Sequence, residues 1–426
     1  MSSDWAERDR AVVWHGFTQM ASYLEDSPVI VERAEGHYLI DVDGRRYLDA
    51  ISSLWVSTFG HKVPELDAAL IDQLDRVAHS TLLGNGNRIV IELSEAMAAV
   101  VPVNKPHFLY ASDGAAAVEQ ALKVAFQYWR NLGERDRDRY LALGGAYHGD
   151  TVGALSLGAG GFGTDLFDPL RFPVMRAPGY EDPLALQMAT EMVLEHGEKL
   201  VAVVLEPLVQ GAAGMRVADA EGYGDLQRAC RDTGALLVCD EVAIGFGRTG
   251  TLFASERCGL SPDIMCLGKC LTGGYLPMSA TAVSEDVFEQ FLGDDLGPRT
   301  LYHGHSFQGN ALAAAVALRH LQLIEQRSAL ANVNERAKQL EVLLDEKVAP
   351  LEAVADIRLA GLMGGVELIP GERRGRRVCA AAVEKGVLLR PLSDVIVLMP
   401  PLSITGEEIE TIVDVLAASI VEVSCS

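Results

Sequence analysis

Two apolar segments that each lead into a charged residue constrain this chain more than any other feature. Residues 236–239 (Leu-Leu-Val-Cys) lead into Asp240, and residues 264–267 (Ile-Met-Cys-Leu) lead through a glycine into Lys269. Each segment has the length and composition of a buried strand. Burial of an ammonium group is costly, so most lysines lie on solvated surfaces. A lysine at the end of such a strand is therefore expected to have its charge suppressed.

A desolvated, neutral lysine amine forms Schiff bases with carbonyl compounds, and this gives Lys269 a chemical use. Asp240 stands 29 positions earlier and is placed to pair with the nitrogen of a cationic ring. A lysine Schiff base with an acid on the ring nitrogen is the protein's part of pyridoxal-phosphate chemistry. Taken singly, an acid after a strand often binds a metal or caps a helix, and a Gly-Lys pair is often a loop. The two together, with Gly268 and the Gly273-Gly274 pair beside the lysine, favour the cofactor.

Two G-x-G-x-x-G patterns, at residues 245–250 and 158–163, resemble the fingerprint of a dinucleotide site. That fingerprint opens a helix and has an acid about 20 residues further on. The segment after the first pattern is too short for such a helix, and Asp263 stands only 13 residues beyond Gly250. The second pattern runs into an Asp-Pro pair. The sequence therefore argues against hydride transfer.

The bulk composition limits the class of protein and its partners. A chain of 426 residues exceeds a comfortable single core, which favours two domains. The net charge of −23 argues against nucleic acid or anionic membranes as partners. Seven scattered cysteines without a C-x-x-C pair favour a reducing cytoplasm over a zinc site or a disulfide framework. No signal peptide and no apolar run of bilayer length is visible, so we expect a soluble cytoplasmic protein without a metal.

Strands that alternate with helices between about residues 64 and 315 predict an α/β fold with a mainly parallel sheet. We expect three parts, namely an N-terminal segment (1–60) packed with the small domain, a large cofactor-binding domain (61–315) and a C-terminal small α+β domain (316–426). The strand candidates of the large domain are residues 108–111, 140–143, 201–205, 236–239 and 264–267.

Further patterns predict local structure. Residues 38–48 contain an Asp-Gly pair between apolar stretches, which predicts a hairpin. From about residue 316 we expect one long amphipathic helix, short strands near 364–368 and 395–399, and a closing helix. Residues 115–129 have apolar side chains at helical spacing. The side chains expected to face the core there are Val118, Ala121, Leu122, Ala125, Phe126 and Trp129.

A phosphate group needs clustered backbone N–H groups, which a helix N-terminus supplies. Residues 112–116 (Ser-Asp-Gly-Ala-Ala) lie between a predicted strand and a predicted helix, and Gly114 permits close approach of the backbone. A plain capped turn is the alternative, and the presence of Lys269 favours the phosphate. Residues 303–310 precede an Ala-rich helix and resemble a second anion-binding turn.

Two other side chains suit a flat heterocycle and an acidic substrate. Tyr147, in the run Tyr-His-Gly-Asp, can stack on a ring, although a lone Tyr-His pair is more often structural. Arg390 follows a predicted strand and can hold a carboxylate through two hydrogen bonds. Surface solvation is the ordinary alternative for an arginine. Both assignments therefore depend on a cofactor site around Lys269.

With these residues in place, the chain resembles the class III (ω-type) pyridoxal-phosphate aminotransferases over nearly its whole length. The pattern Asp-Glu-x-x-x-Gly-Phe-Gly-Arg-Thr-Gly at residues 240–250 and the pattern Leu-Gly-Lys-x-Leu-Thr-Gly-Gly at 267–274 are together highly specific for that class. Within the class, the chain is most similar to the biotin-pathway branch, which aminates 8-amino-7-oxononanoate to 7,8-diaminononanoate. The motifs behind this second similarity are residues 13–20, 52–55, 127–129, 147–150, 390–391 and 399–401.

The resemblance implies a fold type I enzyme that binds pyridoxal phosphate. Lys269 would carry the cofactor as a Schiff base and then move a proton during the reaction. Asp240 would keep the ring nitrogen of the cofactor protonated, and Tyr147 would cover one face of the ring.

The resemblance also implies a homodimer with shared active sites. Gly114 and Ala115 would bind the cofactor phosphate, and Ser306 would reach it from the partner subunit. The substrates would be small molecules, with Arg390 on the carboxylate of the keto acid. The substrate-binding residues implied in this way are Phe17, Trp55, Gly304 and Arg390.

The resemblance specifies the amino acceptor better than the amino donor. S-adenosylmethionine is the expected donor, but the branch that uses it typically has Tyr at Phe17, Trp at Leu54 and Tyr at Val397. A lysine-using branch shares Arg-Pro-Leu and Asp-Val-Ile within residues 390–396, so lysine is the competing donor. Three further hypotheses stay open at this point. They are an ω-transaminase that acts on a diamine, a β-amino acid or a ketone, an aminomutase or racemase, and a non-catalytic cofactor-binding protein.

Overall fold

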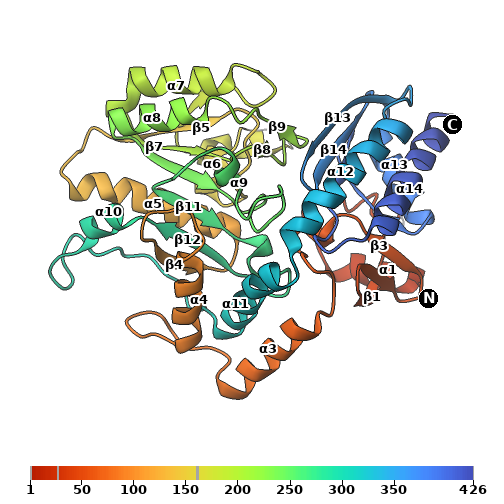
Figure 1. Cartoon of the computed structure of the whole chain (residues 1–426), viewed down its shortest axis with the longest axis horizontal. Helices are drawn as coiled ribbons and strands as arrows, with labels where there is room; N and C mark the ends of the chain where they lie inside the picture. The colour runs from red at the N-terminus through yellow and green to blue at the C-terminus, as the bar shows by residue number, and fades with distance from the viewer. Residues whose placement is uncertain (1, 26–27, 160–162, 426) are drawn as a thin grey trace.

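The computed structural model describes residues 2–25, 28–159 and 163–425. Figure 1 shows a large group of helices around a central sheet, and beside it a smaller group that contains the C-terminal elements in blue. The N-terminal strands, in red, lie against this smaller group. The predicted α/β fold class is confirmed.

The central sheet is mainly parallel, as predicted. The strands β11, β10, β7, β5 and β6 run parallel, and β12 is antiparallel to both of its neighbours. From one edge to the other, the described strands are β4 (His107–Ala111), β12 (Ser279–Val283), β11 (Ile264–Leu267), β10 (Leu236–Asp240), β7 (Leu200–Leu205), β5 (Arg139–Leu143) and β6 (Met175–Ala177).

All five predicted strands are present, with bounds that differ by at most one residue at either end. The sequence analysis missed β6 and β12. β12 reads Ser-Ala-Thr-Ala-Val and is buried along its whole length, although two of its side chains carry hydroxyls. Thr281 Oγ1 donates to the carbonyl of Ala117 at 2.9 Å, and Ser279 Oγ donates to the carbonyl of Asp113 at 2.6 Å. These bonds satisfy the hydroxyls inside the core, so a polar sequence can form a central strand.

Helices cover both faces of this sheet. Among the described residues, no helix combines the length and the apolarity that are needed to cross a membrane. A short ladder pairs β8 (Val209–Gln210) with β9 (Arg216–Val217). The helices are α3 (Pro64–Arg76), α4 (Arg88–Ala98), α5 (Gly114–Asn131), α6 (Val152–Leu157), η1 (Thr164–Leu170), α7 (Ala185–His196), η2 (Gly197–Lys199), α8 (Tyr223–Thr233), α9 (Ala254–Arg257), η3 (Lys269–Thr272), α10 (Glu285–Phe288), η4 (Glu289–Phe291) and α11 (Ala311–Gln326).

Alternate side chains of the strands pack on opposite faces of the sheet, as the pleat requires. In β5, Tyr140 and Ala142 pack with α5 and α6 on one face. Leu141 and Leu143 of the same strand pack with α7 and α8 on the other face. β7 is buried on both faces along its whole length, which accounts for its unbroken apolar sequence.

The predicted helix over residues 115–129 is confirmed as part of α5, with one error in its core. Phe126 was expected in the core, but it is 39% exposed. Its ring lies at the edge of the apolar stripe, where the guanidinium of Arg130 stacks on it at 4.3 Å from the centroid. The long cationic side chain of Arg130 therefore covers the Phe126 ring, which does not pack in the hydrophobic core.

The glycine pattern at residues 245–250 forms turns and does not open a long helix. Gly247 and Gly250 have φ of 99° and 96°, and the next helix, α9, has four residues. The rejection of a dinucleotide fingerprint at this place is therefore confirmed. The pattern at residues 158–163 lies partly outside the described residues.

The C-terminal part is an antiparallel sheet covered by helices. The prediction of one long helix from residue 316 was wrong, because α11 ends at Gln326 and α12 begins at Ala329. Ser328, between them, has a φ of 51°, which a continuous helix does not allow. In spatial order the strands are β13 (Val354–Ala360), β14 (Met363–Leu368), β17 (Val395–Leu398) and β16 (Arg390–Leu392), and the helices are α12 (Ala329–Lys347), α13 (Arg374–Glu384) and α14 (Gly406–Ser424).

The N-terminal segment joins the C-terminal part through a second sheet. The predicted hairpin is confirmed, because β2 pairs antiparallel with β3. β15 then pairs parallel with β3, which supports the expected packing of this segment on the small domain. The boundaries at residues 60 and 315 stay predictions. The elements involved are α1 (Ser2–Val12), β1 (Val31–Glu35), β2 (Tyr38–Asp41), β3 (Arg46–Asp49), α2 (Ser52–Trp55) and β15 (Val387–Leu388).

Candidate active site

The two charged residues that follow apolar strands lie in one cavity of about 720 Å³. Asp240 is the last residue of β10, and its neighbour in the parallel register is Cys266 of β11. Lys269 follows β11 and begins η3. Because the carboxyl ends of parallel strands meet at one edge of the sheet, both side chains reach the same space. The other predicted site residues that line this cavity are Trp55, Gly114, Ala115 and Tyr147.

The amine of Lys269 is buried, and its environment suppresses its charge. Burial lowers the pKa of Lys269 below the usual value for a lysine, although the charges of Asp240 and Glu206 act in the opposite direction. The indole ring of Trp55 covers the amine, with Nζ at 4.8 Å from the ring centroid. A neutral lysine amine is the nucleophilic form that attacks a carbonyl carbon.

Asp240 is held by two hydrogen bonds at the floor of the cavity. Its Oδ2 lies 2.7 Å from Nδ1 of the buried His148, and its Oδ1 accepts from the backbone N–H of Val242 at 3.0 Å. Burial opposes a charge on His148, but the hydrogen bond to Asp240 and the charges of Asp240 and Glu206 raise the pKa of His148 above its usual value. The imidazole therefore supports a negative charge on Asp240.

The turn before α5 provides a cradle for an anion. Asp113 caps the helix by accepting from the N–H of Ala116 at 2.9 Å, and the first amides of a helix have no acceptor within it. A Cβ atom on Gly114 would lie 2.4 Å from Cγ1 of Val242, so only a glycine fits there. The amides of Gly114 and Ala115 consequently lie open to the cavity at the positive end of the helix dipole.

The turn that carries Tyr147 packs directly against this cradle. A Cβ atom on Gly149, which has a φ of 125°, would lie 2.4 Å from Cβ of Ala115. Tyr147 donates its hydroxyl to Asp150 at 2.8 Å. Burial and this carboxylate raise the pKa of Tyr147 above its usual value, so the phenol keeps its proton. Its ring is therefore a neutral surface beside the cavity.

Glu206 is a buried acid of this cavity that the sequence analysis missed. It directly follows β7, as Asp240 follows the apolar run of β10, and the same pattern of an apolar strand leading into an acid could have identified it. Its Oε1 accepts from the N–H of Tyr147 at 3.1 Å, and its Oε2 accepts from the N–H of Gly211 at 3.2 Å. Burial, together with the charge of Asp240, raises the pKa of Glu206 to about 7, although His148 and the two N–H donors act in the opposite direction.

Four predicted residues do not line this cavity in the described chain, and their assignment to the site stays a prediction. Phe17 is 61% exposed in the N-terminal segment. Gly304 and Ser306 are exposed in the turn before α11. Arg390 lies in β16 opposite Val397, and burial lowers its pKa while the charge of Tyr147 acts against this shift.

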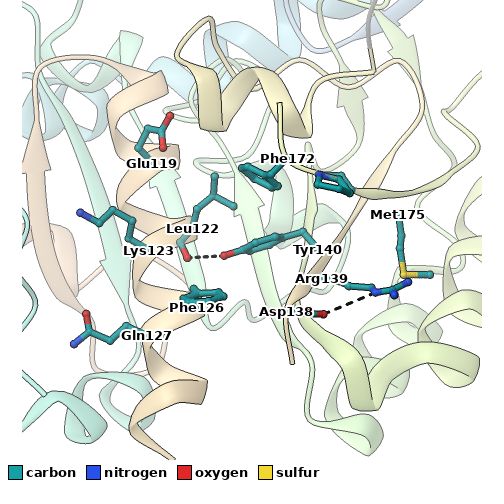
Figure 2. Close-up of a pocket in the computed structure, with 12 residues that line it drawn as sticks. Glu119, Leu122, Lys123, Phe126, Gln127, Asp138, Arg139, Tyr140, Phe172 and Met175 are labelled. Atoms are coloured by element: carbon teal, nitrogen blue, oxygen red, sulfur yellow. Dashed lines mark hydrogen bonds and ion pairs between the residues drawn. The ribbon is translucent and has the colours of Figure 1, made fainter. Parts of the chain in front are cut away.

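Another cavity, of about 840 Å³, lies between α5 and the edge of the sheet at β5 and β6. Figure 2 shows two polar contacts in its lining: Tyr140 donates to the carbonyl of Leu122 at 2.8 Å, and Asp138 pairs with Arg139 at 3.8 Å. Glu119 accepts from the N–H of Gly153 at 2.8 Å. The mispredicted Phe126 lines this second cavity, and Lys269 does not.

Comparison with known proteins identifies the family. A family model described as aminotransferase class-III matches residues 20–420, which is almost the whole chain. The chain belongs to the class III aminotransferases. It is therefore a transaminase that acts on small molecules, and its cofactor is pyridoxal phosphate.

Relatives of this class III aminotransferase match it over nearly their full length. It is 46% identical to the adenosylmethionine-8-amino-7-oxononanoate aminotransferase of Nitratidesulfovibrio vulgaris, over 98% of this chain and 81% of the relative. The crystal structure of the enzyme of that name from Methanocaldococcus jannaschii has a TM-score of 0.95 at 37% identity and covers 99% of each chain. An amine transaminase from an uncultivated Pseudomonas species, in its PLP-bound form, has a TM-score of 0.91 at 30% identity, over 96% of this chain and 98% of that one.

The residues around the cavity fit pyridoxal phosphate. Gly114 and Ala115 line the cavity at the start of α5, where the first amides of the helix suit a phosphate group. Asp240 offers a carboxylate to a protonated ring nitrogen, and Lys269 offers an amine to a carbonyl group. Three chemically different parts of the cofactor thus have a matching group in one cavity.

Proposed function

We propose that this class III aminotransferase transfers an amino group to 8-amino-7-oxononanoate and forms 7,8-diaminononanoate, with S-adenosylmethionine as the donor. The donor loses its amino nitrogen and becomes a carbonyl compound, and the ketone carbon of the acceptor gains that nitrogen. The main support for the proposed chemistry is that one cavity is lined by Lys269, Asp240 and the Gly114 turn. The name shared by relatives of up to 46% identity supports the pair of substrates.

The side chains of the cavity suit the separate tasks of a transamination. When bound, pyridoxal phosphate supplies an electron sink for the carbon that loses its proton. Lys269, with its suppressed charge, takes a proton from the donor carbon and returns one to the acceptor carbon. Asp240, supported by His148, holds the ring nitrogen in its protonated form. Tyr147 covers a ring face, and the amides of Gly114 and Ala115 hold the phosphate.

The substrate groups are assigned to the rim of the same cavity. Trp55 is 6% exposed and lines the space above Lys269, where it excludes water and contacts the apolar chain of the substrate. We assign the acceptor carboxylate to Arg390, whose guanidinium binds such a group through two parallel hydrogen bonds. We place Phe17 beside the donor.

The assembly assigned to this function is a cytoplasmic homodimer with shared sites. Ser306 and Gly304 are exposed and lie outside the cavity of their own chain, although the phosphate and substrate assignments require them. Phe307 beside them is 64% exposed, as is expected of a side chain that another protein surface covers. In this arrangement each chain contributes its 303–310 turn to the site of its partner.

Lysine is a second candidate donor, and particular residues favour it. Leu54 is 47% exposed and Val397 is buried, and neither offers the aromatic ring that a sulfonium and an adenine would use. A lysine donor makes no such demand. The acceptor and the roles of Lys269 and Asp240 are the same for both donors.

Absorption spectra of the cofactor during each half-reaction test the proposal. S-adenosylmethionine or lysine is added separately to the purified enzyme, and 8-amino-7-oxononanoate is added after the donor has converted the bound cofactor to its amine form. We expect one donor to change the spectrum and the acceptor to restore it, with the Lys269→Ala variant inert to both. If neither donor changes the spectrum and the acceptor is ignored, the assignment to these substrates is wrong.

A further inference from the structure

The segment that carries Trp55 has an unusual backbone. Ser52, Ser53 and Trp55 have φ of 51°, 61° and 66°, in the left-handed region that favours glycine. Three such residues within four positions persist only when their surroundings fix them. The contacts that hold residues 52–57 therefore decide where the indole of Trp55 lies.

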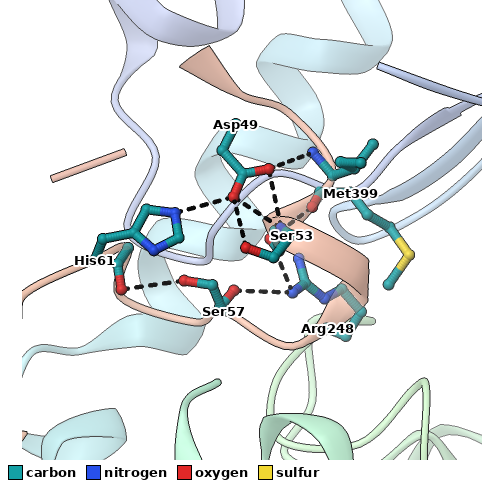
Figure 3. A network of polar contacts seen from close by, with 9 residues as sticks. Asp49, Ser53, Ser57, His61, Arg248 and Met399 are labelled. Atoms are coloured by element: carbon teal, nitrogen blue, oxygen red, sulfur yellow. Dashed lines mark hydrogen bonds and ion pairs between the residues drawn. The ribbon is translucent and has the colours of Figure 1, made fainter. Parts of the chain in front are cut away.

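An acid holds the start of this segment, as Figure 3 shows. The carboxylate of Asp49 is wholly buried and accepts from the backbone N–H of Ser53 at 2.8 Å and from its hydroxyl at 3.4 Å. His61 Nε2 lies 3.1 Å from the same carboxylate. A charged acceptor forms stronger hydrogen bonds with an N–H than a neutral one does. Asp49 thus stabilises the positive φ of Ser53.

A buried arginine holds the other side of the segment. Arg248 has no exposed surface, and its guanidinium donates to the carbonyl of Ser57 at 3.4 Å, to Oγ of Ser52 at 3.5 Å and to the carbonyl of Pro400. No carboxylate of the described residues pairs with it. Burying a cation without a carboxylate partner costs free energy of folding. We therefore expect Arg248 to have a role beyond stability.

The clamped segment contacts the chain that directly follows the reactive lysine. Cys270 Sγ donates to the carbonyl of Trp55 at 3.4 Å, and the guanidinium of Arg248 lies 4.0 Å from the same sulfur. A Cβ atom on Gly274 would lie 3.0 Å from the backbone of Ser57, so the chain after Lys269 packs tightly on the segment. A shift of residues 52–57 would therefore move the indole relative to the Lys269 amine.

We propose that Asp49 and Arg248 are positioning residues for transamination, which act by holding Trp55 over the Lys269 amine. The proposal rests on the proposed role of Lys269. Arg248 belongs to the turn at residues 245–250, Asp49 to β3, and Pro400 to the C-terminal part, so the clamp joins three parts of the chain beside one reactive group.

A double-mutant cycle tests whether Arg248 acts through Trp55. Arg248→Lys keeps the charge but loses the fork of donors, and should lower kcat by about 10- to 100-fold, because a small misplacement near a reacting group has an effect of that size. KM should change much less, since the carboxylate site is elsewhere. In a Trp55→Ala background the same substitution should change kcat by less than about twofold, because the group through which it acts is gone. Asp49→Asn should behave in the same way.

Arg137→Lys is the matched control, because Arg137 also donates to backbone carbonyls, of Gly197, Leu200 and Thr233, but lies away from the cavity. It should leave kcat unchanged.

Hydrogen exchange of the cofactor-free full chain gives a readout apart from activity. The amides of residues 52–57 should exchange faster in Arg248→Lys and Asp49→Asn than in the native protein or in Arg137→Lys.

Several results would overturn the proposal. These are a native kcat in both variants, losses that simply multiply with that of Trp55→Ala, or unchanged exchange at residues 52–57. Failure of both variants to fold would assign Asp49 and Arg248 to stability alone. Lys269→Ala separates this outcome from failure of the proposed function: if that variant stays active, the lysine assignment is wrong, whatever the clamp does.

Discussion

At the scale of single residues, the site depends on which of its neighbouring ionisable side chains hold a proton. Asp240 and Glu206 end adjacent strands within one buried region, where two negative charges would repel each other strongly. His148 bonds to Asp240, whereas Glu206 receives two backbone N–H groups and has a pKa of about 7. The cavity therefore contains one acid that is bonded to an imidazole and a second acid, behind Tyr147, that titrates near neutral pH.

Glu206→Gln should change how the stability of the cofactor-free protein depends on pH. Because the folded pKa of Glu206 is raised from 4.5 to about 7, its contribution is fully present below pH 4.5 and is lost as the pH rises through about 7. The shift corresponds to about 3 kcal/mol in the free energy of unfolding. The variant should gain stability relative to the native protein by an amount of that order across this range.

Urea unfolding at a series of pH values measures this effect. Glu341→Gln, an exposed acid on α12, serves as the control and should follow the native protein at every pH. A parallel course of the Glu206→Gln and native curves would show that the pKa of Glu206 is the same in the folded and unfolded protein, contrary to the effect of its burial.

At the scale of elements, the start of α5 shows why one small residue decides the cradle. Gly114 and Val242 both line the cavity, and any side chain at position 114 would meet that valine. The apolar face of α5 packs on the sheet through Val118 and Ala121, so the helix cannot shift outward without losing core contacts. The phosphate cradle is therefore as rigid as the core beneath it.

Gly114→Ala should weaken cofactor binding by about tenfold or more, because the new Cβ atom displaces the turn whose amides hold the phosphate. Val242→Ala in the same chain should restore part of the affinity, since it removes the nearest atom. Equilibrium titration of the cofactor-free enzyme with pyridoxal phosphate measures both effects.

Gly224→Ala in α8 is the control for the effect of an added methyl group on a helix. Nothing lies within 4 Å of the Cβ atom that it introduces, so it should bind the cofactor normally and be slightly more stable than the native protein. Native affinity in Gly114→Ala would show that the phosphate lies elsewhere.

The elements that the sequence predicted correctly are those whose burial alone determines their composition. β7, β10 and β11 are buried on both faces and read as unbroken apolar runs. β12 was missed because its hydroxyls are satisfied by α5, which no local pattern reveals. The end of α11 was missed for a similar reason. Ser328 has a positive φ, and a serine in the sequence does not indicate such a backbone conformation.

At the scale of the whole molecule, the site unites residues that are far apart in the chain. Gly114, Glu206 and Lys269 follow or adjoin different strands of the central sheet, whose topology brings them to one cavity, and Asp49 belongs to the separate sheet of the N-terminal segment. The sequence predicted the strand ends because an acid or a lysine after an apolar run is unusual. It could not predict the clamp at Arg248, because that contact depends on how the C-terminal part packs against the N-terminal segment.

Complementation between inactive variants tests the shared site at this scale. Lys269→Ala removes the amine of its own cavity, and Ser306→Asp places a negative charge where we expect the phosphate of the partner's cavity. Each variant alone should be inactive, and a mixed dimer should regain activity, because one of its two cavities then holds both native residues. Activity should be measured after the two chains are produced together. A monomeric mass, or no recovery in a mixed dimer, would contradict the shared arrangement.

The most direct test of the account is to find which lysine carries the cofactor. Borohydride reduction of the enzyme loaded with pyridoxal phosphate fixes the cofactor to that lysine, and peptide mass spectrometry then locates it. The account predicts the label on Lys269, at the end of β11. A label on any other lysine, with Lys269 unmodified, would contradict the assignment of this cavity as the site of transamination.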